Sequence, residues 1–215
     1  MYLINAIYFK GMWKYEFDPE ATGKQPFYLK NGNTEMVDMM ELECDLMFMS
    51  NDLFSAVQLP YGDGAFCMTI LLPHSQFTTD DIAEELTNQN WNTWMNSFSE
   101  ISVTVKLPKF KFEFSRLLND DLIDMGMGIA FDKNDADFSG INPDEQLYIS
   151  RVLHKTFIDV NEEGTEAAAV TAVEISLTSA GPFFVVDRPF IFTIQENSSG
   201  TILFMGKVNK PEYQE

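Results

Sequence analysis

Few side chains in this sequence have the type and spacing that catalysis or metal binding requires. His74 follows Leu72-Pro73 in a predicted turn, and His154 stands in an alternating segment, where a lone histidine is more often a core residue than a catalyst. There is no GxSxG, HExxH, CxxC or phosphate-loop motif. The acidic stretch at 132–137 lacks the central glycine and the closing glutamate of a calcium-binding loop, so we expect a solvated loop there. The sequence therefore predicts no enzyme, no metal and no cofactor.

The segment from Glu162 to Pro189 has a different potential, because its side chains alternate as those of a strand do. Gly164 frees the backbone for a turn, and two sets of side chains follow it. A strand places such sets on opposite faces. The uncharged set is Thr165, Ala167, Ala169, Thr171, Val173 and Ile175, and the set with both glutamates is Glu166, Ala168, Val170, Ala172 and Glu174.

This alternation predicts a strand that could enter a sheet with its uncharged face buried and its glutamates in water. The buried set is mostly small, as an already packed sheet would require. The other interpretation is an alanine-rich linker or a short helix, since alanine and glutamate both favour helix. Residue types alone leave both interpretations open.

The composition is that of a packed globular chain with an acidic surface. The 215 residues could form a sizeable core, and 13% of them are aromatic. A net charge of −19 argues against nucleic acid and anionic membranes as partners, and no apolar run reaches membrane-spanning length. The first residues carry no recognisable signal peptide. Cys44 and Cys67 stand in apolar settings, which predicts buried free thiols and leaves the compartment open.

The order of predicted elements indicates one α+β domain with many strands, because no repeat or linker divides residues 1–215. The predicted strands cover 3–13, 36–50, 55–72, 101–114, 147–160, 183–195 and 201–208. The sequence YGDG at 61–64 signals a hairpin, and Pro108 makes 101–114 edge-like. A helix is predicted over 79–98, and a short one over 119–127. The expected core contacts of the longer helix are Ile82, Leu86, Trp91 and Trp94.

Several stretches resemble the serpins, a family of serine protease inhibitors. EEGTEAAAVT at 162–171 resembles the serpin hinge motif almost letter for letter, and VVDRPFIF and GTILFMGKVNKP resemble the two signature stretches at the end of the fold. INAIYFKGMW, FSGI and HKTFIDV fit as well, so that the match runs from Asn5 to Pro211. The one departure is Val170, where inhibitory members more often have a smaller residue. The hinge by this resemblance is Glu162, Glu163, Gly164, Thr165, Glu166, Ala167, Ala168, Ala169, Val170 and Thr171.

The resemblance implies a partial serpin fold. It comprises a large mixed β-sheet, further β-sheets, few helices and an exposed reactive-centre loop at 162–189. The chain would begin at the third strand of the main sheet, so the first helices and two strands of the family have no counterpart here. Either the sequence is a fragment or a partner chain supplies that part. The family resemblance alone favours an extracellular location.

The resemblance also implies roles for four residues outside the loop. Asn5 and His154 match the shutter pair, a hydrogen bond between neighbouring strands that parts when the loop enters. Trp13 matches the tryptophan of the breach, where insertion begins. Glu162 matches a breach glutamate, and Lys109 matches its lysine partner. The simpler interpretations are a buried polar pair, a core aromatic and a weak surface ion pair.

By this resemblance the chain is a single-use inhibitor of serine proteases. The protease serine would attack the loop and form an acyl-enzyme with it, and loop insertion would then distort the protease active site. Family spacing counts 17 residues from Glu162, which ends at Thr178, and ten back from Pro189, which gives Ser179. Both counts predict cleavage at Thr178–Ser179. The small and apolar neighbours favour an elastase-like or subtilisin-like protease, and chymotrypsin-like cleavage after Leu177 is second.

Two other functions stay open beside inhibition. A non-inhibitory serpin would act as a carrier or chaperone, but such members usually have charged, bulky or proline residues in the hinge, which this hinge lacks. A fragment without independent activity is the other alternative, since the N-terminal part of the fold has no counterpart in the sequence.

Overall fold

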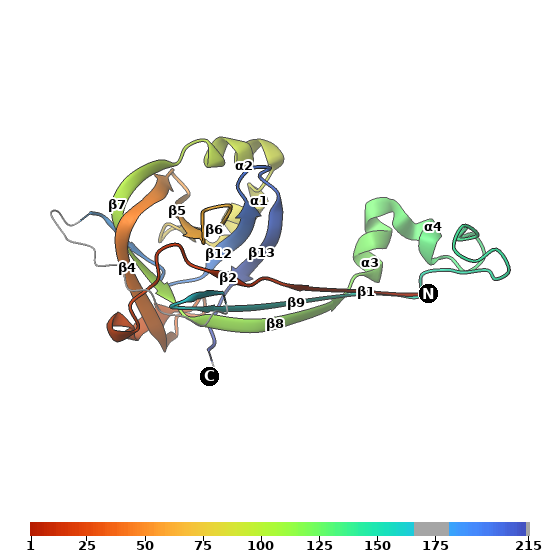
Figure 1. Ribbon diagram of the computed structural model, residues 1–215, viewed down its shortest axis with the longest axis horizontal. Coiled ribbons are helices and arrows are strands. Elements are labelled where there is room, and N and C mark those ends of the chain that lie inside the picture. Colours follow the sequence, from red (N-terminus) through yellow and green to blue (C-terminus); the bar gives the residue numbers. More distant parts are fainter. Residues whose placement is uncertain (166–180, 214–215) are drawn as a thin grey trace. The chain divides into compact units, whose positions relative to one another are not determined.

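A computed structural model describes residues 1–165 and 181–213 of the chain. Its contacts divide the chain into two units, which we describe separately. The small unit contains Met1–Phe9 and Phe112–Ile158, and the large unit contains Lys10–Lys111 and Asp159–Glu215. Figure 1 shows the elements of both units along the chain. No helix in the described ranges has the length and apolar character needed to cross a membrane.

The large unit is built on a curved sheet, which has eight strands among the described residues. Its strands follow the order β11-β7-β4-β5-β6-β12-β13, and β3 pairs with β4. The strands are β3 (Gly23–Tyr28), β4 (Thr34–Ser50), β5 (Phe54–Tyr61), β6 (Phe66–Pro73), β7 (Ser99–Pro108), β11 (Phe183–Val185), β12 (Phe190–Glu196) and β13 (Ile202–Val208). A short helix, η1 (Pro19–Ala21), precedes them.

Two helices, and not the single helix predicted over 79–98, cover one part of this sheet. Thr78 and Asp81 form a capping box at the start of α1 (Thr79–Glu84), and the Thr87 side chain caps α2 (Asn88–Met95). The second cap divides the predicted helix, because a threonine hydroxyl that accepts from a backbone N–H favours a new helix start. Ile82 and Trp94 are buried against the sheet, as predicted. Burial of each contributes roughly 1.5–3 kcal/mol.

The hairpin predicted at YGDG joins β5 to β6, and its turn has positive φ at Gly62 (49°) and Gly64 (93°). The edge position predicted for the strand around Pro108 is wrong. Strand β7 pairs with β4 on one side and with β11 on the other. Pro108 is tolerated because it is the last residue of β7, where its missing N–H removes no interior ladder bond.

Three other predicted strands have different bounds in the structure. The strand expected over 3–13 is divided into β1 (Tyr2–Tyr8) and β2 (Gly11–Met12), which belong to different units. The segment 183–195 is divided between β11 and β12, since Pro189 has no N–H to continue a ladder. The strand expected from 147 begins later, as β9 (Arg151–Asn161).

The small unit contains a parallel strand pair and a short helical segment. Strand β1 pairs with β9 in register from Tyr2↔Arg151 to Tyr8↔Phe157, and β8 (Phe110–Leu117) also pairs with β9. The helix predicted over 119–127 extends further, with a kink at Gly126, whose φ is 98°. The segment consists of α3 (Asn119–Leu122), the π-helical η2 (Ile123–Met127) and α4 (Gly128–Phe131).

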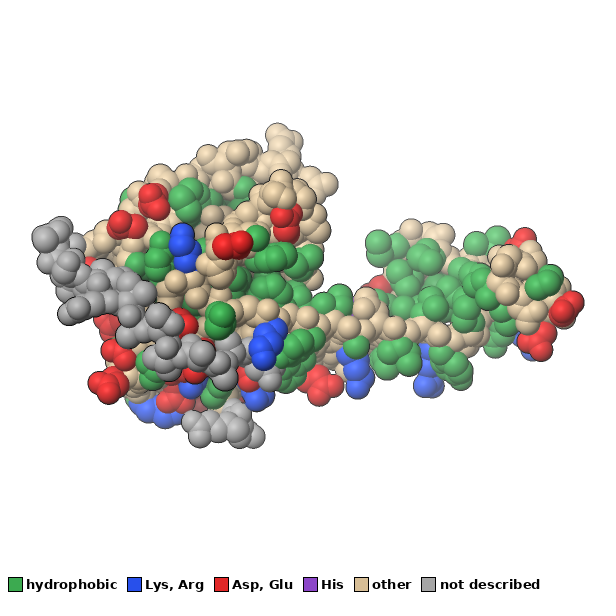
Figure 2. Space-filling model, in the orientation of Figure 1, with side chains coloured by type: hydrophobic (Ala, Val, Ile, Leu, Met, Phe, Trp, Pro, Cys, Tyr) green, Lys and Arg blue, Asp and Glu red, His purple; other side chains and the backbone are tan. Residues whose placement is uncertain are grey.

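Large apolar side chains are exposed on the small unit, and Figure 2 shows them gathered over α3 and α4. Ile4 on β1 is 73% exposed, and Met125 in η2 is 80% exposed. Tyr2, Tyr8, Ile129 and Ile141 are exposed in the same unit. A surface of this kind marks an interaction site in a folded protein.

Candidate functional site

A tight turn after β9 begins the segment that the sequence singles out. Strand β9 ends at Asn161, and the chain reverses into β10 (Gly164–Thr165), which lies antiparallel between β9 and β2. The Asn161 side chain accepts a hydrogen bond from the N–H of Glu163 at 3.1 Å. We call residues 162–165 the hinge turn.

The backbone of the hinge turn is bound to the chain that follows β2. The N–H of Trp13 donates to the carbonyl of Glu163, and the N–H of Phe17 donates to the carbonyl of Glu162, each at 3.0 Å. These bonds satisfy the carbonyl groups of a turn that lies against the sheet. The first residues of the hinge are therefore part of the folded large unit.

Gly164 is required at its position for two reasons. Its φ is 144°, which side chains of L-residues rarely allow. A Cβ on this residue would also lie 2.2 Å from the carbonyl oxygen of Gly11 and 2.7 Å from the Cα of Met12. The glycine thus lets β10 approach the backbone of β2 more closely than any other residue would.

Thr165 lies on the buried side of the turn, on the uncharged face predicted from the alternation. Its side chain is fully buried, and its hydroxyl shares a 2.9 Å hydrogen bond with the hydroxyl of Tyr61. Burial raises the pKa of Tyr61, and the bond to Thr165 opposes that effect only in part. Both hydroxyls consequently stay neutral, and Thr165 has a polar partner inside the protein.

Glu162 and Lys109 form an ion pair that is nearly buried. The carboxylate and the ammonium are 3.0 Å apart, and the side chains are 12% and 14% exposed. The hydroxyl of Thr22 donates a further bond to Glu162 at 2.8 Å. The pair is therefore not an exposed surface contact, and solvent screening is small where water is excluded.

The environment shifts the pKa of both partners toward the charged forms. Burial alone would raise the pKa of Glu162, but Lys109, a backbone N–H and Thr22 outweigh it and hold that pKa below the usual value. Burial alone would lower the pKa of Lys109, but Glu162 outweighs it and raises that pKa. Both groups are charged over the whole neutral range.

Trp13 packs directly behind the hinge turn. Its ring stacks on Tyr61 with centroids 4.4 Å apart, and its indole N–H donates to the carbonyl of Asn161 at 2.9 Å. The side chain is 4% exposed. The same residue therefore closes the core and fixes the end of β9, so the core role and a role at the hinge are compatible.

Asn5 and His154 lie in the small unit, on the two neighbouring strands of its parallel pair. They are Cα partners in the register of β1 and β9. Asn5 is exposed and His154 is half-buried. The shutter role of this pair stays a prediction.

The rest of the predicted hinge and the predicted scissile bond lie outside the described residues. These are the remaining hinge residues Glu166, Ala167, Ala168, Ala169, Val170 and Thr171, and the predicted scissile pair Thr178 and Ser179. The described chain resumes at Gly181, and β11 then pairs parallel with β7. A Cβ on Gly181 would lie 2.0 Å from the carbonyl oxygen of Ser102, so the returning chain is also held closely.

Sequence reasoning missed three residues that complete the site. Thr22 and Tyr61 bind Glu162 and Thr165, and the ring of Tyr213 lies over the ammonium of Lys109. Thr22 is separated from Glu162 by 140 positions in the sequence. No local pattern signals such a contact, because only the folded sheet brings these segments together.

His74 and the two cysteines lie in the folded large unit. His74 shares a 2.8 Å hydrogen bond with the carbonyl of Asn51. Cys44 and Cys67 are buried free thiols, and burial raises their pKa to about 12 and about 11. Over residues 1–165 and 181–213, no group of three or more His, Cys, Asp or Glu side chains is arranged to hold a metal ion.

Comparison with known proteins points to one family. A model of the serpin (serine protease inhibitor) family matches residues 1–211. A serpin-like protein of Methanosarcina acetivorans is 41% identical, in an alignment that covers 99% of this chain and 51% of that protein. The human leukocyte elastase inhibitor is 40% identical, with coverage of 97% and 58%.

Solved structures give the same result. Native protease nexin-1 with heparin matches with a TM-score of 0.85 and 34% identity, over 98% of this chain and 56% of that one. The thermophilic serpin tengpin in its native state matches with a TM-score of 0.87 and 33% identity, over 97% and 55%. The chain spans about half the length of the curated relatives that it matches.

Proposed function

Because the chain belongs to the serpin family, we propose that it inhibits serine proteases as a single-use substrate. The observation that carries this proposal is the hinge turn. Gly164 and the buried, uncharged Thr165 already lie in a sheet, next to the strand end of β9. A loop whose first residues are seated in this way can continue into the sheet without burying a charge.

The proposed reaction begins as ordinary proteolysis. The serine hydroxyl of the protease attacks the carbonyl carbon of Thr178, the peptide bond to Ser179 breaks, and the proton of the serine passes through the protease histidine to the new amine. An ester then joins the protease to Thr178. Insertion of the freed segment pulls the enzyme away, and an oxyanion hole displaced by about 1 Å no longer stabilises hydrolysis of that ester.

The strand arrangement supports the uninserted state that this mechanism starts from. Strands β1 and β9 pair directly and in parallel over Tyr2–Tyr8. Insertion requires these two strands to part, and the predicted shutter residues Asn5 and His154 are partners in that register. The native state would then be kinetically trapped, with the inserted state lower in free energy.

The target class rests on the loop residues and on a relative. Thr178, Ser179 and their small or apolar neighbours favour an elastase-like or subtilisin-like protease. The human relative is named for inhibition of leukocyte elastase. Chymotrypsin-like cleavage after Leu177 is the second candidate, since leucine suits a larger apolar pocket.

A specific observation favours a requirement for more of the serpin fold. The small unit exposes Ile4, Met125 and Ile129, and the chain covers only 51% of the length of a relative at 41% identity. We expect the exposed apolar surface to be covered by the part of the fold that this sequence lacks. Without that part we expect the chain to be a fragment that does not trap a protease.

Incubation with pancreatic elastase tests the proposal. The chain together with a polypeptide that supplies the N-terminal part of the fold should give a band on denaturing gels at the summed mass of elastase and residues 1–178, and the chain alone should give none. Mass spectrometry of the released peptide should find Ser179 at its N-terminus. Elastase with its catalytic serine replaced is the control and should give no band. Complete cleavage without a covalent complex would refute inhibition, and a different new N-terminus would refute the assignment of the bond.

A further inference from the structure

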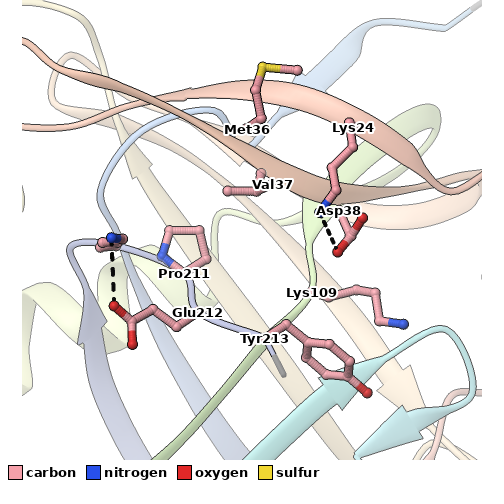
Figure 3. Close-up of a pocket in the computed structure, with 9 residues that line it drawn as sticks. Lys24, Met36, Val37, Asp38, Lys109, Pro211, Glu212 and Tyr213 are labelled. Carbon is pink, nitrogen blue, oxygen red and sulfur yellow. Dashed lines mark hydrogen bonds and ion pairs between the residues drawn. The ribbon is translucent and has the colours of Figure 1, made fainter. Parts of the chain in front are cut away.

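The last described residues of the chain lie beside Lys109, the ion-pair partner of the hinge turn in the large unit. The carbonyl of Glu212 accepts a hydrogen bond from the N–H of Lys111 at 2.7 Å, and Pro211 is buried. Figure 3 shows this segment beside Lys109, at a cavity of about 290 Å³ that is lined also by Lys24, Val37 and Asp38. The segment 211–213 is thereby fixed next to the ion pair of the hinge turn.

The ring of Tyr213 lies over the ammonium group of Lys109. The distance from Nζ to the ring centroid is 4.4 Å, within the range of a favourable cation–π contact. The same ammonium binds the carboxylate of Glu162 at 3.0 Å. Lys109 is therefore held by an aromatic face and by a carboxylate at the same time.

This double contact restricts a side chain that is otherwise long and free to rotate. Lysine has four rotatable bonds, and ordering it opposes ion-pair formation. A ring that already holds the ammonium in place removes part of that entropic cost, so Lys109 binds Glu162 more tightly. Glu162 is the first residue of the hinge turn, and its backbone carbonyl accepts a hydrogen bond from the N–H of Phe17.

We propose that Tyr213 is a positioning residue, which holds Lys109 against Glu162 and so keeps the hinge turn in place before cleavage. The inference rests on the proposed function for its biological meaning, because a hinge turn that opens early would let the loop insert before a protease is bound. The contact between Tyr213 and Lys109 is present in the uncleaved protein, so it can be tested without a protease. The C-terminal segment would in this way stabilise the active state of the loop.

Hydrogen exchange of the whole, uncleaved protein tests this proposal. Tyr213→Ala should raise the exchange rates of the Trp13 and Phe17 amides about two- to tenfold, the range that one lost cation–π contact allows. Tyr213→Phe should keep the native rates, since it retains the ring. Tyr213→Leu keeps apolar bulk without an aromatic face and should behave like Tyr213→Ala, which separates the ring from general packing. Glu212→Gln is the matched control in the same segment and should leave both rates unchanged.

Three outcomes would overturn the proposal. They are native exchange rates in Tyr213→Ala, native rates in Tyr213→Leu, and accelerated exchange in Tyr213→Phe. Formation of the covalent complex with elastase is measured in parallel on the same proteins. If the wild-type chain forms no such complex even with the N-terminal part of the fold supplied, the proposed function fails while the exchange result still decides the role of Tyr213.

Discussion

The carboxylate of Glu162 lies 3.0 Å from the ammonium of Lys109, and each side chain keeps less than a sixth of its surface in water. Glu162 is the first residue of the hinge turn, and Lys109 lies between β7 and β8. The Thr22 hydroxyl donates a further hydrogen bond to the Glu162 carboxylate. The start of the loop is therefore fixed by a charge pair that water hardly screens.

Removing either partner of this pair should destabilise the protein. Glu162→Gln leaves the Lys109 ammonium nearly buried and without its carboxylate, at a cost of about 2–4 kcal/mol in the free energy of unfolding. A double-mutant cycle with Lys109→Met should give a coupling energy of roughly 2 kcal/mol or more. The exposed pair Lys24–Asp38, 2.9 Å apart with side chains 61% and 35% exposed, is the control. Its coupling should stay below about 1 kcal/mol, and equal coupling of the two pairs would contradict the importance of burial.

The same pair predicts a pH dependence of stability. The pKa of Glu162 lies below its ordinary 4.5 in the folded protein, so the stabilisation is complete above 4.5 and is lost as the pH falls through the folded pKa. The pKa of Lys109 lies above its ordinary 10.5, so its contribution is complete below 10.5 and is lost above the folded value. Urea titrations should show a constant difference between wild type and Glu162→Gln from about pH 6 to pH 9, which shrinks toward pH 3. A difference that grows on acidification would contradict this assignment.

Replacement of Gly164 should be far more costly than replacement of another glycine with positive φ. Gly164→Ala forces a Cβ to within 2.2 Å of the Gly11 carbonyl oxygen at a φ of 144°, and we expect a loss of more than about 3 kcal/mol. Gly32 has a φ of 84° with nothing within 4 Å of an added Cβ, so Gly32→Ala should cost only about 1–2 kcal/mol. Unfolding free energies from urea titration provide the comparison. Similar losses would mean that backbone conformation, and not the close approach of β10 and β2, sets the requirement.

If the chain inhibits as proposed, a charge at position 165 should convert it into a substrate. Thr165→Arg places a guanidinium where the native side chain is fully buried, so the hinge turn should be displaced from the sheet in the uncleaved protein. Insertion must then bury the charge, so the loop should insert slowly and the protease should escape by hydrolysis of the ester. Gel assays with elastase should show less covalent complex and more cleaved inhibitor. Thr165→Ser keeps the hydroxyl for Tyr61 and should behave like wild type. Undiminished covalent complex in Thr165→Arg would exclude insertion that starts at this residue.

The two thiols should be almost unreactive until the protein unfolds. Burial raises the pKa of Cys44 to about 12 and that of Cys67 to about 11, from an ordinary 9.0. At pH 8 the thiolate fractions fall about 1,000-fold and about 100-fold, and a disulfide reagent should label the native protein correspondingly slowly. Labelling in concentrated urea gives the rate of the accessible thiols. Rapid labelling of either cysteine in the native protein would show that its surroundings open to solvent.

The sequence predicts the kinds of elements better than their bounds. Alternation finds β4, β5 and β13 closely, because period-two patterns persist where one face of a strand is buried. Strand β6 is buried on both faces, and its continuous apolar run predicts it. The helix expected over 79–98 is divided by the Thr87 cap, and the strand expected over 101–114 is divided into β7 and β8. The edge position predicted for that strand is wrong, since strand order depends on pairing partners that are distant in the sequence.

For the hinge, the sequence by itself determines the features that depend only on neighbouring residues. It places a glycine where the backbone needs a positive φ, and an uncharged residue on the face that becomes buried, because backbone freedom and side-chain alternation are properties of neighbouring residues. Only the tertiary structure decides that Glu162 meets Lys109 and Thr22, and that Tyr213 covers Lys109. These contacts join segments that are distant in the chain, and their strength comes from the exclusion of water in the folded sheet.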